Sequence, residues 1–290
     1  MARAHVEDPP AEARLSDGTI ARIVRSPYAG GWELDVDGTP QSHVDLDDPT
    51  HVHFEYVARM AAVIDQIGQS GQVITAIHLG AGAYTLPRYI EATRPGSRQQ
   101  VVEIEPALVD LVRAELPLPS PRAGGSIRTR VGDARTVLGK LPEGLVGAAD
   151  LLVSDVYAGA RIPAHVTSVE FYRLAARFLS ATGILLVNIA DGAGLAFARR
   201  QVATIREVLP HIALLAEVQI LKGRRFGNLV VAASASPLPT EWLPRLMAAG
   251  PHPAKVAQGA EVDTFVATAQ VTTDADATPS PAPASSLFER

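Results

Sequence analysis

The chain has 290 residues, of which 47% are hydrophobic, and this length and composition are typical of one main globular domain. Its net charge of -5 argues against a nucleic-acid partner, because phosphate backbones select basic surfaces. The absence of cysteine excludes disulfides and thiolate metal sites. No signal peptide is recognisable and no apolar run reaches the ~18 residues of a membrane span, so we expect a cytoplasmic protein without a membrane partner.

The first 50 residues contain short β-type runs. Thr19 to Arg25 and Trp32 to Val36 are separated by the turn-forming stretch Ser26 to Gly31. We therefore expect a small N-terminal β-meander domain over residues 1–50. From His53 to Ile67 apolar residues recur every three or four positions, which indicates an amphipathic helix leading into the main domain.

A regular alternation of strands and helices follows and predicts a mostly parallel sheet covered on both faces. We expect Pro106 to begin a helix and Gly183 to close one. The predicted strands are 73–79, 100–104, 127–131, 150–155 and 183–189, and the predicted helices are 84–94, 106–115, 134–141, 167–180 and 194–209.

The last two strand-like runs, 212–221 and 228–233, have no helix between them and predict an antiparallel hairpin. The fold class is therefore α/β, a Rossmann-like, S-adenosylmethionine-dependent methyltransferase fold with a mostly parallel seven-stranded sheet. We assign residues 51–250 to a nucleoside-binding catalytic domain. Residues 251–290 form a C-terminal extension, expected to be disordered from about Thr272 because Ala, Pro, Ser and Thr dominate there.

Three elements in the first half of this domain indicate a nucleoside site. The first predicted strand runs into Gly80-Ala81-Gly82, where glycine permits a tight turn and close approach to a ligand. Glu103 ends the second strand about 20 residues later, the position of a carboxylate that binds ribose hydroxyls. Gly132-Asp133-Ala134 follows the third strand, and Asp133 there is also suited to cap the next helix. Together these elements predict an adenosine pocket.

A longer ordered set of short motifs carries a family resemblance. The set comprises Leu34 to Gln41, Asp45 to Asp48, His53-Phe54-Glu55, Val102 to Glu105, Gly132-Asp133-Ala134, Asp150 to Asp155, Glu170-Phe171-Tyr172 and Phe226 to Leu229. On these residues the chain resembles the spermidine synthase family of polyamine aminopropyltransferases over roughly Trp32 to Ser234. The resemblance implies transfer of an aminopropyl group from decarboxylated S-adenosylmethionine to a small-molecule amine, without a metal, and it is compatible with a homodimer.

The resemblance also implies roles for individual residues. Asp155, at the end of the fourth predicted strand, would orient or deprotonate the attacking amine. The donor would be bound by Gln41, Gly80, Gly82, Glu103, Asp133 and Ala134, with Glu103 on the ribose and Asp133 with Ala134 at the adenine. The acceptor side would be formed by Tyr157, His53 and Glu55.

The chain departs from the family pattern at two acidic positions. The segment from Gly80 to Tyr84 contains no acid, and Ala158 stands where the family has a second carboxylate. A methyltransferase that uses intact S-adenosylmethionine and a non-catalytic nucleoside-binding homologue therefore remain alternatives. An NAD-dependent oxidoreductase is a weaker one, because Thr85 stands where the dinucleotide fingerprint requires its last glycine.

Overall fold

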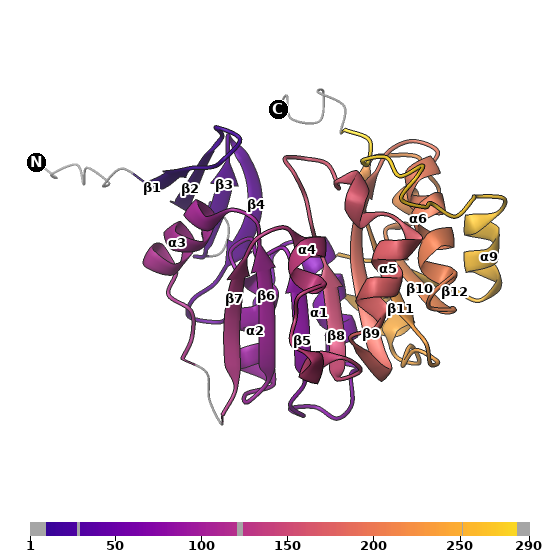
Figure 1. Cartoon of the computed structure of the whole chain (residues 1–290), viewed down its shortest axis with the longest axis horizontal. Coiled ribbons are helices and arrows are strands. Elements are labelled where there is room, and N and C mark those ends of the chain that lie inside the picture. The colour runs from indigo at the N-terminus through magenta and orange to yellow at the C-terminus, as the bar shows by residue number, and fades with distance from the viewer. Residues whose placement is uncertain (1–9, 28–29, 121–123, 251, 283–290) are drawn as a thin grey trace, which may run out of the picture.

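Two β-sheets organise the molecule, a small one at the N-terminal end and a large one formed by the rest of the chain (Figure 1). The structure, a computed structural model, describes residues 10–27, 30–120, 124–250 and 252–282. None of the helices within these ranges is long and apolar enough to cross a membrane.

The small sheet consists of four antiparallel strands joined in chain order. The two predicted β-runs are confirmed, and the edge strands on either side of them were not predicted. Ala, Glu and Arg at the first edge have little strand propensity, and Pro40 in the other is tolerated only because an edge strand has free N–H positions. The strands are β1 (Ala11–Arg14), β2 (Ile20–Arg25), β3 (Trp32–Val36) and β4 (Thr39–Val44).

The small sheet packs on the main domain through an apolar layer. Ile23 and Leu34 of the sheet share one buried cluster with Leu108, Leu111 and Val112 of helix α3 (Pro106–Glu115). Pro106 begins this helix as expected, since its missing N–H has no partner in a first helical turn. The contact fixes β4 beside the loops at one edge of the large sheet.

The large sheet has eight strands in the order β12-β10-β11-β9-β8-β5-β6-β7. Neighbours from β9 to β7 are parallel, whereas β10, β11 and β12 are added antiparallel. The strands are β5 (Thr75–Leu79), β6 (Arg98–Glu103), β7 (Ser126–Val131), β8 (Ala149–Ser154), β9 (Leu179–Asp191), β10 (His211–Ala216), β11 (Gly227–Ser234) and β12 (Lys255–Gln258).

Helices cover both faces of this sheet, with α4, α5 and α6 on the face turned to the viewer and α1 and α2 behind (Figure 1). Separate buried apolar clusters fill the two layers. The remaining helices are α1 (Glu55–Ile64), α2 (Thr85–Thr93), α4 (Ala134–Leu138), η1 (Glu143–Leu145), η2 (Ala164–Val166), α5 (Val169–Ala176), α6 (Ala196–Arg206), α7 (Val218–Leu221), α8 (Leu243–Ala249) and α9 (Ala260–Val266).

The predicted fold class is confirmed, and its strand order places the site. The chain moves outward from β5 to β6 and β7, then returns to the other side of β5 to form β8. In open α/β sheets, ligands bind at such a switch point, beyond the carboxyl ends of the strands. The loops after β5, β6 and β8 are therefore expected to form the site.

Two local predictions were wrong. Gly183 lies inside β9 and does not close a helix: α5 already ends at Ala176. A Cβ on Gly183 would come within 2.5 Å of the Ala149 carbonyl oxygen, so glycine here permits close contact where the β8–β9 register shifts. The predicted final hairpin pairs as expected, but the short helix α7 interrupts its connection.

Residues 252–282 are integrated into the main domain. Strand β12 pairs with β10 and adds an eighth strand to the seven predicted. The disorder expected from Thr272 on is corrected for residues 272–282, which we call the C-terminal strap; residues 283–290 lie outside the described residues. Thr272 and Ser280 of the strap are 3% and 0% exposed.

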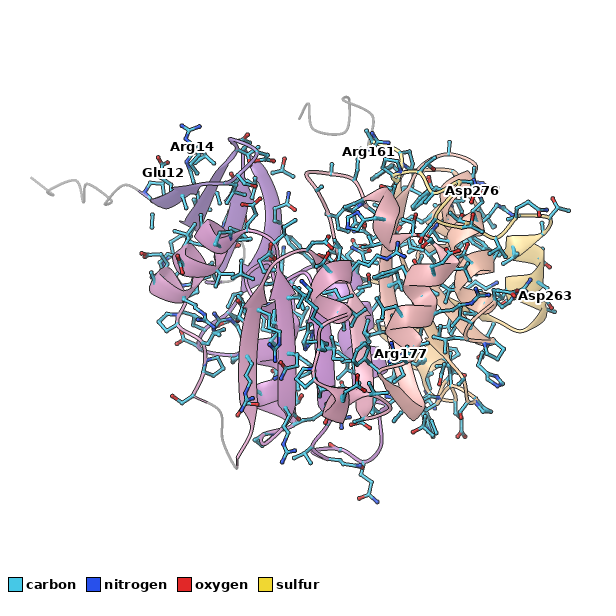
Figure 2. All side chains as sticks on the ribbon, in the orientation of Figure 1. Glu12, Arg14, Arg161, Arg177, Asp263 and Asp276 are labelled. Atoms are coloured by element: carbon cyan, nitrogen blue, oxygen red, sulfur yellow. The ribbon has the colours of Figure 1, made fainter. Side chains whose placement is uncertain are left out.

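The strap is attached by specific polar contacts. Asp274 accepts two hydrogen bonds of 2.7 Å from Arg135, and Ser280 exchanges hydrogen bonds with Ile162. Arg161 and Asp276 lie at the same end of the main domain, where the strap crosses it (Figure 2). The contacts of Ser280 hold the loop after β8 against the strap.

Candidate active site

The turn Gly80-Ala81-Gly82 after β5, which we call the glycine corner, lies against the end of β8 and against β4 of the N-terminal sheet. Gly80 has a φ of 89°, and a Cβ there would lie 2.2 Å from the backbone oxygen of Asp155. Gly82 has a φ of 49°, and its Cβ would lie 2.4 Å from Oγ of Ser42 on β4. The amide of Ala83 donates to that same hydroxyl at 3.2 Å. Glycine is required most strongly at Gly80, where the neighbouring oxygen belongs to the backbone, whereas at Gly82 the left-handed conformation favours glycine and a Cβ would displace the Ser42 hydroxyl.

Glu103 lies at the carboxyl end of β6 and turns its side chain toward this corner. Oε2 accepts from the amide of Ala81 at 2.9 Å, and Oε1 accepts from the amides of Ile104 and Glu105 at 2.9 and 3.1 Å. Three amides thus fix the carboxylate, while its remaining lone pairs are still able to accept from hydroxyl groups. Beside it, Ile104 is 57% exposed and offers an apolar surface to a flat ring.

Asp133 ends the next loop and caps α4, as its sequence position allows. One oxygen accepts from the amide of Thr136 at 2.8 Å, and the other lies 2.6 Å from Nε2 of His165. Burial raises the pKa of Asp133, but the Thr136 and His165 contacts outweigh it and lower the pKa overall. Ala134 follows directly and is buried. Hydrogen bonding to adenine would have to compete with His165.

Asp155 stands at the end of β8, across the switch point from the glycine corner. Its two oxygens accept from different side chains, Oδ1 from Nδ2 of Asn188 at 2.9 Å and Oδ2 from the hydroxyl of Tyr56 at 3.2 Å. Burial raises the pKa of Asp155, and the two hydrogen bonds lower it only in part. A carboxylate in this environment is a stronger base than an exposed aspartate.

Two tyrosines on either side of this carboxylate remain neutral. Burial, together with the charge of Asp155, raises the pKa of Tyr56 and Tyr157 well above the usual value. The hydroxyl of Tyr157 accepts from the amide of Ala190 at 3.1 Å and donates to the backbone oxygen of Asn188 at 3.3 Å. Tyr157 is thereby fixed against β9 and closes one side of the site.

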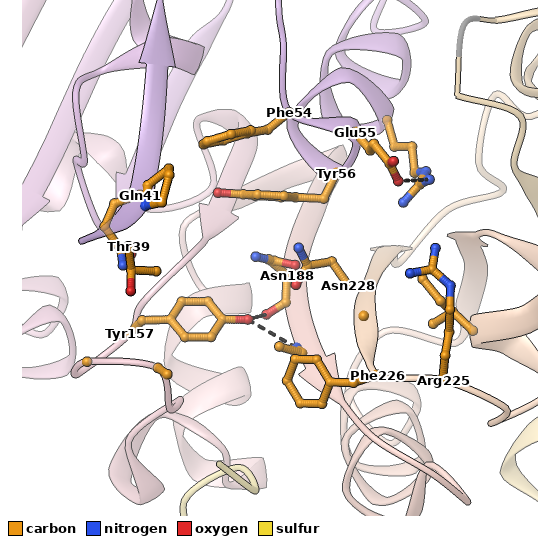
Figure 3. A pocket seen from close by; sticks show the side chains of 17 residues that line it. Thr39, Gln41, Phe54, Glu55, Tyr56, Tyr157, Asn188, Arg225, Phe226 and Asn228 are labelled. Atoms are coloured by element: carbon orange, nitrogen blue, oxygen red, sulfur yellow. Dashed lines mark hydrogen bonds and ion pairs between the residues drawn. The ribbon is translucent and has the colours of Figure 1, made fainter. Parts of the chain in front are cut away.

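A cavity of about 400 Å³ adjoins this group, between α1, β4 and the loops around β11 (Figure 3). The rings of Phe54 and Tyr56 lie nearly parallel along one wall, with centroids 6.4 Å apart. The aromatic lining residues are Phe54, Tyr56, Tyr157 and Phe226; the charged ones are Glu55, Arg59 and Arg225; and the amides are Gln41, Asn188 and Asn228. Aromatic walls with a few polar groups suit a small amine.

Three of the predicted site residues line this cavity, whereas His53 does not. Gln41, Glu55 and Tyr157 line the cavity, and Glu55 forms an ion pair of 3.0 Å with Arg59. His53 instead packs against the ring of His43, with centroids 4.8 Å apart. No group of three or more His, Asp or Glu side chains within the described ranges is arranged to hold a metal ion.

Sequence reasoning missed two residues that contact Asp155. Tyr56 directly follows the His53-Phe54-Glu55 motif, so its place beside a predicted site was the available signal. Asn188 is the one polar residue of the apolar run Ile184–Ile189 in β9, and a buried amide within such a run requires a partner. That partner was not visible without the β8–β9 pairing.

Comparisons with known proteins agree with this geometry. No protein-family model matches the chain. A polyamine aminopropyltransferase from Vibrio vulnificus is 28% identical over 138 residues, covering 47% of this chain and 44% of that protein. One from Chromobacterium violaceum is 26% identical over 154 residues, covering 53% and 56%. The chain thus spans about half the length of the curated relatives it matches.

The structural likeness extends over nearly the whole chain. A probable spermidine synthase from Corynebacterium glutamicum superposes with a TM-score of 0.80 at 29% identity, covering 92% of this chain and 96% of that one. The chain is related to the spermidine synthase family. The spermidine synthase of Thermotoga maritima, with a TM-score of 0.55 at 14% identity over 89% and 83% of the two chains, shares the fold.

This spermidine synthase-like chain lacks an acid at two positions of the family pattern, Ala158 and the loop from Gly80 to Tyr84. Ala158, where the family has a second acid, forms an isolated β-bridge with Arg161 in the loop after β8. The acid-free glycine loop contacts Ser42 of the N-terminal sheet. Neither position supplies a carboxylate to the site.

Proposed function

We propose that the protein is an aminopropyltransferase that moves the aminopropyl group of decarboxylated S-adenosylmethionine to a small amine. The observation that carries the proposal is Asp155, fixed by Tyr56 and Asn188 between the glycine corner and an aromatic cavity. The relationship to the spermidine synthase family supports the same reaction.

On this proposal, the donor lies across the carboxyl ends of β5 and β6. Glu103 accepts from the ribose hydroxyls, as its free lone pairs allow. Ile104 packs against the adenine, and Gly80 and Gly82 let the backbone approach the donor closely. Gln41 reaches the reacting end from β4, since it lines the cavity beside Tyr56.

The amine must lose a proton, because it is protonated at neutral pH and its nitrogen then has no free lone pair. Asp155 accepts that proton, either directly or through Tyr56, which passes its own hydroxyl proton to Asp155 as it receives one. The nitrogen lone pair then forms a bond to the methylene carbon next to the sulfonium. The carbon–sulfur bond breaks, its electrons stay on sulfur, and methylthioadenosine leaves. Alignment of the two substrates supplies most of the remaining acceleration.

Product analysis tests the proposal. The purified protein is incubated with an amine and either decarboxylated or intact S-adenosylmethionine, and the adenosine products are separated by chromatography. We expect methylthioadenosine with the decarboxylated donor. Formation of S-adenosylhomocysteine from the intact donor would establish the methyltransferase alternative instead. Binding of methylthioadenosine without any product from either donor would favour a non-catalytic homologue.

A further inference from the structure

One end of the cavity presents hydrogen-bond acceptors. The carboxylate of Asp155 only accepts, so the Asn188 amide turns Nδ2 toward it and Oδ1 away from it. Asn188 lines the cavity and is 3% exposed, and its Oδ1 is buried without a hydrogen-bond partner. Tyr56 also gives its only proton to Asp155, which leaves its oxygen as an acceptor. The N–H groups of an amine complement this end.

A second lining residue presents an unsatisfied donor. Arg59 on α1 is 2% exposed, and its Nη2 pairs with Glu55, but its Nε–H is buried without a hydrogen-bond partner. A buried N–H without an acceptor is unfavourable, and an oxygen atom of a ligand in the cavity would satisfy it. The Nε–H of Arg59 is therefore satisfied by a ligand atom that accepts a hydrogen bond, and an ammonium group has no such atom.

The charges around Arg59 already balance one another. Glu55 pairs with Arg59 at 3.0 Å, and Glu217 pairs with Arg225 at 2.5 Å. A second ammonium group there would meet two ion pairs whose charges already cancel, and no carboxylate among the described lining residues is free of an arginine partner. Desolvating an ammonium requires an uncompensated anion close by, so a diamine fits this end poorly.

We propose that the acceptor carries a single ammonium group at one end and, at the other, an oxygen that accepts a hydrogen bond, either a hydroxyl or a carboxylate. The inference rests on the proposed aminopropyl transfer. The amine donates to Asn188 and Tyr56 next to Asp155, and the oxygen accepts from Nε–H of Arg59. The protein therefore selects amino alcohols or amino acids over α,ω-diamines.

Three acceptors of equal carbon-chain length test this: putrescine, aminobutanol and γ-aminobutyrate. Methylthioadenosine release gives kcat/KM for each with decarboxylated S-adenosylmethionine. Calorimetry on the protein saturated with methylthioadenosine measures the binding of each without turnover. We expect aminobutanol or γ-aminobutyrate to exceed putrescine about tenfold or more in both measurements, because putrescine leaves a buried donor unpaired. The better of the two identifies the oxygen as hydroxyl or carboxylate.

Arg59→Lys keeps the positive charge but removes Nε–H, and we expect it to reduce that preference to about twofold or less. Arg206→Lys is the matched control, since Arg206 lies on α6 outside this cavity and pairs with Asp263, and it should leave the ratio of rates unchanged. Equal or better binding of putrescine by the wild-type protein would overturn the inference while leaving aminopropyl transfer intact. Failure of every acceptor to release methylthioadenosine would overturn the proposed function, whereas the binding comparison would still judge the acceptor class.

Discussion

The close contact between the glycine corner and the strand that carries Asp155 makes Gly80→Ala a sensitive test of the site's geometry. An alanine at the φ of 89° found at Gly80 is strained by ~1–2 kcal/mol, the cost of a left-handed conformation for a residue with a Cβ. The new Cβ would also lie 2.2 Å from the backbone oxygen of Asp155, closer than real Cβ atoms come to any heavy atom. The Asp155 oxygen belongs to the backbone and the new Cβ is attached directly to the Gly80 backbone, so neither atom can rotate away. The ends of β5 and β8 must therefore separate.

We therefore expect Gly80→Ala to lower the free energy of unfolding by about 2–4 kcal/mol, the range of a strained and overpacked position. It should also lower kcat by displacing Asp155. Urea unfolding followed by circular dichroism measures the first effect, and methylthioadenosine release measures the second. Gly159→Ala is the control, since Gly159 has a φ of 58° but no atom within 4 Å of the place its Cβ would occupy, so that only the strain of ~1–2 kcal/mol applies. Equal destabilisation by the two variants would refute the close approach of β5 and β8.

Three further predictions concern other parts of the site. Tyr56→Phe removes a hydrogen bond that lowers the pKa of Asp155, so the acidic limb of the kcat/KM profile should move to higher pH, as measured between weakly acidic and neutral pH. Glu103→Gln should weaken methylthioadenosine binding about tenfold to a hundredfold in calorimetry, since hydrogen bonds to a charged group are lost. Arg135→Gln removes both bonds to Asp274 and should speed proteolytic cleavage of the C-terminal strap about fivefold.

The Glu103 and Arg135 variants each have a matched control. Glu105→Gln changes a neighbouring acid that bonds Ser16 of the N-terminal segment, and binding should stay within about twofold. Arg206→Gln breaks a pair with Asp263 outside the strap and should leave strap cleavage unchanged. If the acidic limb of the kcat/KM profile lies at the same pH in Tyr56→Phe as in the wild type, Tyr56 does not hydrogen-bond the group whose titration sets that limb.

Local patterns were sufficient to predict the frame of the site. Parallel strands buried on both faces appear in the sequence as apolar runs, and their carboxyl ends share one edge, so the sequence alone predicts that Glu103 and Asp155 lie at that edge. The turn after β5 was equally clear, because the conformations of Gly80 and Gly82 are open to glycine and to few other residues.

Local sequence patterns do not predict which segments far apart in the sequence contact each other. Whether Asn188 meets Asp155 depends on the pairing of β8 with β9, which fixes how far Asn188 extends toward the site. The ordering of the C-terminal strap depends on particular contacts, such as Arg135 with Asp274, whereas its composition alone is typical of disorder. The first edge strand was missed because Ala11–Arg14 forms a strand only by pairing with β2.

The most direct test of the account is the turnover of Asp155→Asn. Asparagine has nearly the same size and still accepts a hydrogen bond from Tyr56, so methylthioadenosine binding should be unchanged. With an amine and decarboxylated S-adenosylmethionine, kcat should fall about a hundredfold to ten-thousandfold, the contribution of a general base. Turnover within about threefold of the wild type, with binding intact, would contradict the assignment of Asp155 as the group that accepts the amine's proton.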